Sequence, residues 1–259
     1  MAADGWGGHK GRPYGEVGVS LKERVMRRFV VLCFLVMVGC TAALGVDRAK
    51  VDERLQRSAQ VVREIMSAPD KGVPKDLLDK AVCVGVVPAE KKFAFGVGGS
   101  YGRGALVCRH GGTGAWAAPS MIIMSGGSFG FQIGGESTDV LFIVMNPDGA
   151  RKLIQDSVKL GGDASVAGGP VGRTSAGATD LQMHAEILSY SRARGLFAGI
   201  SLSGAMVKQD KEGNKMLYGR EISARDILLR SEVHAPATAL PLDSTLDHHS
   251  PRGGQPWSE

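Results

Sequence analysis

The chain has 259 residues, of which 43% are hydrophobic and 37 are glycine, and its formal net charge is +5 at pH 7. This length allows one ordinary domain with flanking segments, and the hydrophobic share is sufficient for a buried core. The glycines follow no Gly-X-Y period, which excludes a collagen-like rod and indicates tight strands and many turns. The basic balance favours an anionic partner, either nucleic acid or anionic lipid.

The first 46 residues divide into two segments. Residues 1–25 are polar and glycine-rich, and we interpret them as an extension upstream of a true start at Met26, or as a disordered tail. Residues 26–46 place two arginines before an apolar run, as in a secretory signal peptide, although a signal anchor stays open. The sequence before Cys40 resembles a bacterial lipobox. It predicts export to the periplasmic side of a bacterial envelope with lipidation at Cys40; ordinary signal cleavage just downstream, giving a secreted protein, is the alternative.

The next part of the chain begins with a helix and continues into a strand. Apolar residues recur at every third or fourth position over residues 47–66, which predicts an amphipathic helix. Residues 75–80 predict one or two further helical turns. The apolar run of residues 81–87 has the composition of a strand, and Pro88 is expected to end it.

Residues 92–145 are expected to be rich in short strands. Phe129, Phe131 and Ile133 alternate with small or polar residues, which is the period of two typical of a strand. The strands predicted in this region span residues 92–97, 104–108, 114–116, 120–124, 129–135 and 139–145.

Beyond residue 146 the pattern becomes mixed. It predicts a helix over 148–160, strands over 183–190 and 196–203, a hairpin turn at 210–214, and a short closing helix over 223–230. Residues 231–259 are proline-rich and aperiodic, and a disordered tail is expected there. The fold class that follows is a single α+β domain over residues 47–230. It contains a bent antiparallel sheet or a partly closed β-barrel with a few flanking helices.

Glycines are dense in residues 95–108, which read FGVGGSYGRGALVC. Their spacing is one residue too long for a dinucleotide fingerprint, and the residues that follow predict a strand instead of a helix. We therefore expect the glycines to allow close approach of backbones in a crowded sheet. Cys83 and Cys108 lie in predicted strands; a disulfide would form if these strands are neighbours, and two buried thiols are the favoured alternative.

Two constellations could carry catalysis. Asp180, His184 and Glu186 could hold a metal ion, and Ser100 or Ser128 could act as a nucleophile. The deaminase and nucleophile-elbow contexts that would accompany such roles are missing, so we expect no catalytic residue, no metal and no cofactor.

Cations beside glycine-rich turns favour anion binding. Backbone N–H groups in such turns can converge on an anion, and arginine offers a bidentate fork for phosphate. The residues predicted to form a lipid-phosphate surface are Lys91, Lys92, Arg103, Arg173, Arg192 and Arg194. Nucleic acid is disfavoured as the partner, because few aromatic side chains accompany these cations to stack bases.

Several segments occur together in an order that resembles a known family. They read AVCVGVVP, GVGGSYGRG, WAAPSMI, GGSFGFQIGGESTDVLFIV, GGDASVAGGPVGR, LSYSRARGLFAGISLSGAMV and YGREISARDILL. Together they resemble the SYLF domain over about residues 50–230, in a form typical of exported bacterial members. The resemblance implies a non-catalytic domain that binds anionic lipid at a membrane surface. The alternatives are a metal-dependent or serine hydrolase acting on an envelope substrate, and a structural module that binds a protein.

Overall fold

The computed structural model describes residues 47–256 apart from 69–71, 173–183 and 194–195, and it describes no side chains for residues 92–98, 127–136 and 193. A helix over residues 47–66 opens this part of the chain, as its apolar periodicity predicts. The elements that follow are α2 (Lys75–Lys80), β1 (Cys83–Cys108), η1 (His110–Gly112), β2 (Ser120–Val144), α3 (Pro147–Leu153), β3 (Ser157–Lys159), β4 (Val166–Gly168), β5 (Ile187–Ala193), β6 (Leu196–Gly199), β7 (Met206–Gln209), α5 (Lys211–Tyr218), α6 (Ala224–Leu228) and α7 (Leu240–His249).

Two long strands, β1 and β2, replace most of the short strands expected between residues 81 and 145. They pair antiparallel from Cys83 opposite Val144 to Leu106 opposite Ser120. The expected stop at Pro88 is wrong, because Pro88 lies where the register shifts between Val87 and Glu90. A β-bulge tolerates proline because its extra residue is unpaired and donates no N–H hydrogen bond to the partner strand.

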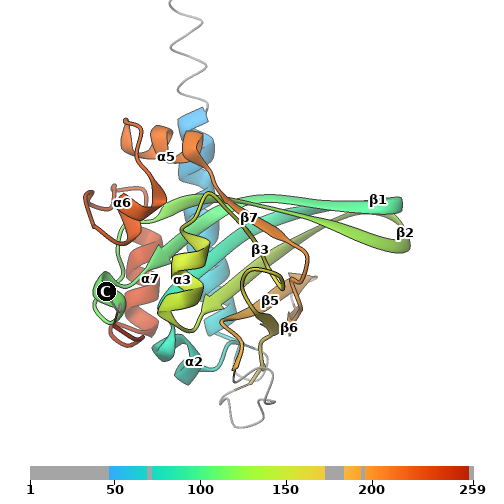
Figure 1. The fold of residues 1–259 in the computed structure, drawn as a ribbon, viewed down its shortest axis with the longest axis horizontal. Helices are drawn as coiled ribbons and strands as arrows, with labels where there is room; N and C mark the ends of the chain where they lie inside the picture. Colours follow the sequence, from blue (N-terminus) through green and yellow to red (C-terminus); the bar gives the residue numbers. More distant parts are fainter. Residues whose placement is uncertain (1–46, 69–71, 173–183, 194–195, 257–259) are drawn as a thin grey trace, which may run out of the picture. The chain divides into compact units, whose positions relative to one another are not determined.

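β1 folds back on itself, so that its first half, which begins at Cys83, and its second half, which ends at Cys108, lie side by side (Figure 1). The Cα atoms of Cys83 and Cys108 are 4.0 Å apart and the two residues form a disulfide, so the interpretation as free thiols is wrong. A side-chain carbon added at Gly104 would lie 2.0 Å from the carbonyl oxygen of Val86. At this position, therefore, glycine does serve close backbone approach, as the sequence predicted.

The strands form one strongly curled sheet, a half-barrel flanked by helices. The hydrogen-bonded order is β3-β7-β2-β5-β4, with β1 added on β2 and β6 on β5. All of these pairs are antiparallel except β4 with β5. The α+β class and the bent sheet are confirmed, but the sheet is mixed where a purely antiparallel one was expected.

Both faces of the sheet are buried. On β2, Leu141 and Ile143 face the cluster built from the 47–66 helix, α2 and α7. Val140 and Phe142 alternate with them and face the cluster that contains residues of α3 and α6. Residues 140–144 of β2 are continuously apolar because both faces of this part of the strand are covered by helices.

Several segments differ from the expected elements, and the strand expected over 114–116 is reduced to a single bridge between Arg109 and Trp116. The predicted turn at 210–214 is the start of α5, where the Asp210 side chain accepts a hydrogen bond from the backbone N–H of Gly213. The predicted helix over 148–160 ends at Leu153, and Ser157–Lys159 forms β3. In place of the expected tail, α7 buries Leu242 and Leu246 completely in the core.

A buried arginine joins this carboxyl-terminal segment to the sheet. Arg109 is fully buried and donates hydrogen bonds to the carbonyl of Ala81 (2.8 Å) and to the carbonyl and hydroxyl of Ser250 (3.2 and 2.6 Å). Its guanidinium carbon lies 4.0 Å from the ring centre of Trp116, whose Nε1 also donates to the Ser250 carbonyl (3.0 Å). Burial lowers the pKa of Arg109 to about 10, so it stays charged at neutral pH.

Candidate anion-binding site

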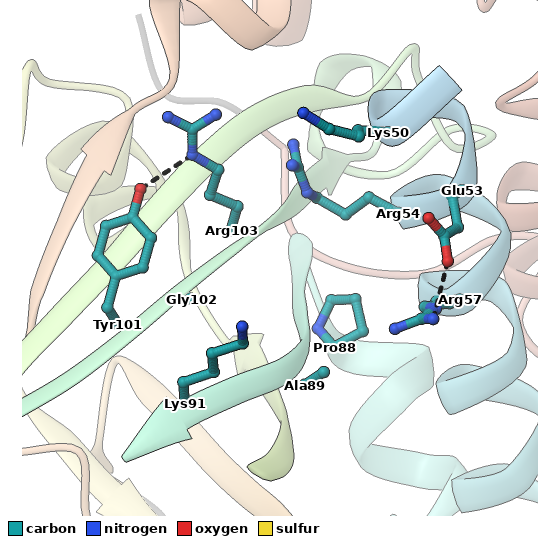
Figure 2. A pocket seen from close by; sticks show the side chains of 10 residues that line it. All are labelled: Lys50, Glu53, Arg54, Arg57, Pro88, Ala89, Lys91, Tyr101, Gly102 and Arg103. Carbon is teal, nitrogen blue, oxygen red and sulfur yellow. Dashed lines mark hydrogen bonds and ion pairs between the residues drawn. The ribbon is translucent and has the colours of Figure 1, made fainter. Parts of the chain in front are cut away.

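A pocket of about 300 Å³ lies between the 47–66 helix and β1 (Figure 2). Its charged and aromatic lining residues are Lys50, Glu53, Arg54 and Arg57 of the helix and Lys91, Tyr101 and Arg103 of β1. The volume is at the small end of the range of about 300–1,000 Å³ found for ligand pockets. Five cations thus face one carboxylate in a space suited to a small anionic group.

The helix contributes three cations from one face. Lys50, Arg54 and Arg57 are spaced by four and three residues, which places side chains one above another on a helix. Val51 and Leu55 lie on the buried side of the same helix. The periodicity that builds the core therefore also aligns the cations.

β1 contributes from both of its halves. The bulge brings Ala89, whose backbone has φ of 53° and whose N–H donates to the Asp139 carboxylate, to the pocket with Lys91. The returning half supplies Arg103, whose Nε donates to the hydroxyl of Tyr101 at 2.9 Å. Gly102 lies between them, where an added side-chain carbon would be 2.5 Å from Val87.

The pocket keeps an excess of positive charge. Glu53 pairs with Arg57 at 2.7 Å, and Lys50 pairs with Asp47 at 3.2 Å. Burial lowers the pKa of Arg54, although the nearby Asp210 carboxylate opposes this effect. The hydrogen bond to Tyr101 raises the pKa of Arg103. Because arginine titrates far above neutral pH, both guanidinium groups are charged and available to an anion.

The structure separates the residues that the sequence grouped as one surface. Lys91 and Arg103 line the pocket. Arg192 lies on β5, where it pairs with Asp139 at 2.8 Å and with Glu64, so it ties the sheet to the 47–66 helix. Lys92 belongs to β1 and pairs through its backbone with Glu136, but its side chain is outside the described part, as are Arg173, Arg194 and Cys40.

Among the residues considered for catalysis, Glu186 is held by structural hydrogen bonds. Glu186 accepts hydrogen bonds from Lys152 (2.8 Å) and from the Ser165 backbone (2.8 Å). Burial would raise its pKa, but these hydrogen bonds outweigh burial and lower it. In the described ranges, no three His, Cys, Asp or Glu side chains come together as a metal site. Asp180 and the side chain of Ser128 lie outside the described residues.

Sequence reasoning missed the three cations of the helix. Their spacing of four and three is visible in residues 50–57, but the periodicity of this segment predicts only an amphipathic helix with charges between its apolar positions. Asp210, which lies behind two of the arginines, was also missed because the sequence of its segment predicts a hairpin turn, whereas the residue is the N-cap of α5. Lys91 and Arg103 line the same pocket because β1 folds back on itself. No local sequence pattern predicts this folding back.

Comparison with known proteins gives consistent matches. A family model described as "Ysc84: Las17-binding protein actin regulator" matches residues 125–249, which extends through α7. The chain is 36% identical over 199 residues to "SH3 domain-containing YSC84-like protein 1" of Homo sapiens, covering 74% of this chain and 57% of that protein. It is 32% identical over 181 residues to "LAS seventeen-binding protein 3" of Saccharomyces cerevisiae (strain ATCC 204508 / S288c), covering 69% of this chain and 39% of that protein.

The chain thus spans little more than half the length of the human relative and less of the yeast one. The residues matched by the family model run from within β2 to the end of α7. The family description is that of a binding protein. The sequence resemblance and these matches agree, and the chain belongs to the Ysc84/SYLF domain family.

Proposed function

We propose that this domain binds the anionic headgroups of membrane lipids through the pocket between the 47–66 helix and β1. The observation that carries the proposal is the convergence of five cations on a space of about 300 Å³, with Glu53 as the one carboxylate in its lining. Arg54 and Arg103 come from opposite sides of this space (Figure 2). Guanidinium groups bind phosphate oxygens through charge-assisted, often bidentate hydrogen bonds.

The surroundings of the pocket suit a membrane surface. Each basic residue near an anionic membrane contributes about 1 kcal/mol, so five could hold a domain at the surface without acyl chains. Tyr101 lines the pocket and is 46% exposed. Tyrosine is favoured at membrane interfaces because its ring is apolar and its hydroxyl is polar. No helix in the described residues is both long and apolar enough to cross a membrane.

Vesicle co-sedimentation tests the proposal. The chain beginning at Asp47 removes the apolar segment of residues 26–46 and keeps the compact unit of residues 47–259. Binding to vesicles that contain acidic phospholipid, lost at high salt and missing with neutral vesicles, is the expected result. Binding that is equal on neutral and acidic vesicles would contradict an electrostatic site.

Export and lipid anchoring form a second part of this proposal. It rests on the arginines and apolar run of residues 26–46 and on the lipobox-like sequence that ends at Cys40. Metabolic labelling with a fatty-acid analogue in a bacterial host is the test. Labelling of the chain that is lost in Cys40→Ser is expected, and labelling that persists in this variant would refute acylation at Cys40.

Protein binding is the alternative within the same family. The family description and the name of the yeast relative refer to binding of Las17, and this chain covers only 39% of that relative. We therefore place lipid binding first, because the basic pocket lies within the domain itself.

A further inference from the structure

Asp210 is a buried carboxylate directly behind the pocket. It lies between the end of β7 and the start of α5, and its side chain is only 2% exposed. One carboxylate oxygen, Oδ1, accepts a hydrogen bond of 3.0 Å from the backbone N–H of Gly213 and so caps α5. The other oxygen, Oδ2, accepts no hydrogen bond.

Two arginines of the pocket face this second oxygen. Arg54 Nη1 lies 3.8 Å from Asp210 Oδ2, and Arg103 Nε lies 3.7 Å from it. These separations exceed the 2.7–3.2 Å typical of a hydrogen bond, and Arg54 Nη1 has no hydrogen-bond partner. Asp210 therefore acts on the two guanidinium groups through its charge, and it does not fix them by directed bonds.

This arrangement balances charge inside the protein when the pocket is empty. The Arg54 side chain is 14% exposed, and Arg103 lies near enough to repel it. A buried charge without a counter-ion is costly, so the carboxylate stabilises the pair. The same negative charge opposes any anion that approaches the two arginines from the pocket side.

We propose that Asp210 serves as the internal counter-ion of the pocket and sets its affinity for anions by competing with them. The proposal rests on the anion-binding role of the pocket given above. It assigns the carboxylate two separate roles: Oδ1 caps α5, and the negative charge of the group acts on the two arginines that face Oδ2.

Asp210→Asn separates these two roles. Asparagine is as good a helix cap as aspartate, because its side-chain oxygen can also accept the bond from Gly213. The substitution removes the negative charge, and with the oxygen on Gly213 it places the amide NH2 where Oδ2 faced the two arginines. Asp148→Asn is the matched control, because it raises the net charge equally on α3, which contributes no residue to the pocket.

The test uses the full chain with inorganic phosphate as the probe, in titration calorimetry and thermal melts at constant ionic strength. Asp210→Asn should bind phosphate about tenfold more tightly than the unchanged chain, which is the effect of one unit charge across a partly screened pocket of effective dielectric about 20. Without phosphate the variant should melt at a lower temperature, and phosphate should raise its melting temperature more than that of the unchanged chain. Asp148→Asn should leave the affinity within about twofold, as expected for a distant screened charge.

Phosphate affinity that is unchanged or lower in Asp210→Asn, or phosphate binding that is undetectable in both proteins, would overturn the proposal. Vesicle binding by the unchanged chain distinguishes this failure from failure of the proposed function. If acidic vesicles bind but the variant gains nothing for phosphate, Asp210 is a cap alone and lipid binding stands. If the variant gains affinity for phosphate and acidic vesicles do not bind, the pocket takes a soluble anion and the lipid proposal fails.

Discussion

Replacing Arg109 by methionine removes the charged group that joins the carboxyl-terminal segment to the sheet. Methionine keeps a long flexible side chain, so packing changes little while the guanidinium donors are lost. The three shortest bonds from Arg109 run to the Ala81 carbonyl, the Ser250 carbonyl and the Ser250 hydroxyl.

The expected loss of stability is about 3 kcal/mol. Each hydrogen bond from a charged donor contributes about 1.5–3 kcal/mol, and the stacking on Trp116 adds about 1 kcal/mol. Relief of the desolvation of the buried guanidinium, several kcal/mol, offsets much of this sum. The Ser250 carbonyl also keeps its bond from Trp116 Nε1, which limits the loss.

Urea denaturation at pH 7 measures the free energy of unfolding, and a thermal melt should show a decrease of about 6–12 °C for a domain of this size. Amide exchange gives a local readout, because the N–H of Gly254 donates to the Asp79 carbonyl at 2.8 Å and should exchange faster in the variant. Arg109→Lys keeps the charge but loses the planar fork, and it should also be destabilised. A stability of Arg109→Met within 0.5 kcal/mol of the unchanged chain, the usual range for surface substitutions, would refute the reasoning.

Three further predictions concern the same framework. Replacing Cys83 and Cys108 by serine should lower the free energy of unfolding by about 3.5 kcal/mol, the loop-closure value for a bridge with a sequence separation of 25. Unchanged stability to urea would contradict a structural disulfide. Burial, with a smaller effect of Asp247, raises the pKa of Asp243 from its ordinary 3.8 to about 7. The folded chain therefore holds a proton that the unfolded chain has lost, and this group's contribution to stability falls as pH rises from about 4 to about 7. Asp243→Asn should flatten the pH dependence of the urea midpoint between pH 4 and 8, and the same slope in both proteins would count against a buried carboxyl. Ending the chain after Arg230 removes α7 and should abolish cooperative thermal unfolding, whereas a melt like that of the full chain would show that α7 is dispensable.

Local patterns predicted the fold class because hydrophobic periodicity determines which elements form. The helix over residues 47–66 and the alternation in β2 are both strong signals of this kind. Pro88 shows the limit: proline usually ends a strand, and the bulge that accommodates it is defined only by the partner strand. The proline-rich sequence after residue 230 similarly predicts a disordered tail, whereas α7 forms there because Leu242 and Leu246 pack against residues far away in the chain.

The candidate site was predictable only in part for the same reason. Lys91 and Arg103 were recognised as cations beside glycines, but their neighbours Arg54 and Arg57 come from another element. Arg192 also lies beside a glycine-containing turn in the sequence, but in the structure it forms ion pairs with Asp139 and Glu64. The charge of a side chain does not show whether it binds a ligand or stabilises the fold, because this depends on which carboxylates lie near it in the folded chain.

The central claim is that the pocket, and not the overall basic charge, binds anionic lipid. The most direct measurement compares vesicle binding by two variants of the chain beginning at Asp47. One variant changes Lys50, Arg57 and Lys91 of the pocket to glutamate; all three are exposed, so the fold should persist.

The matched control changes three exposed cations outside the pocket, Lys80, Lys159 and Arg252, to glutamate. Both variants have the same net charge, and circular dichroism confirms that each is folded. Loss of binding to acidic vesicles in the pocket variant, with most binding kept in the control, is the result that the account predicts. Equal loss in both variants would show that net charge alone drives the association, and retained binding in the pocket variant would place the lipid site elsewhere.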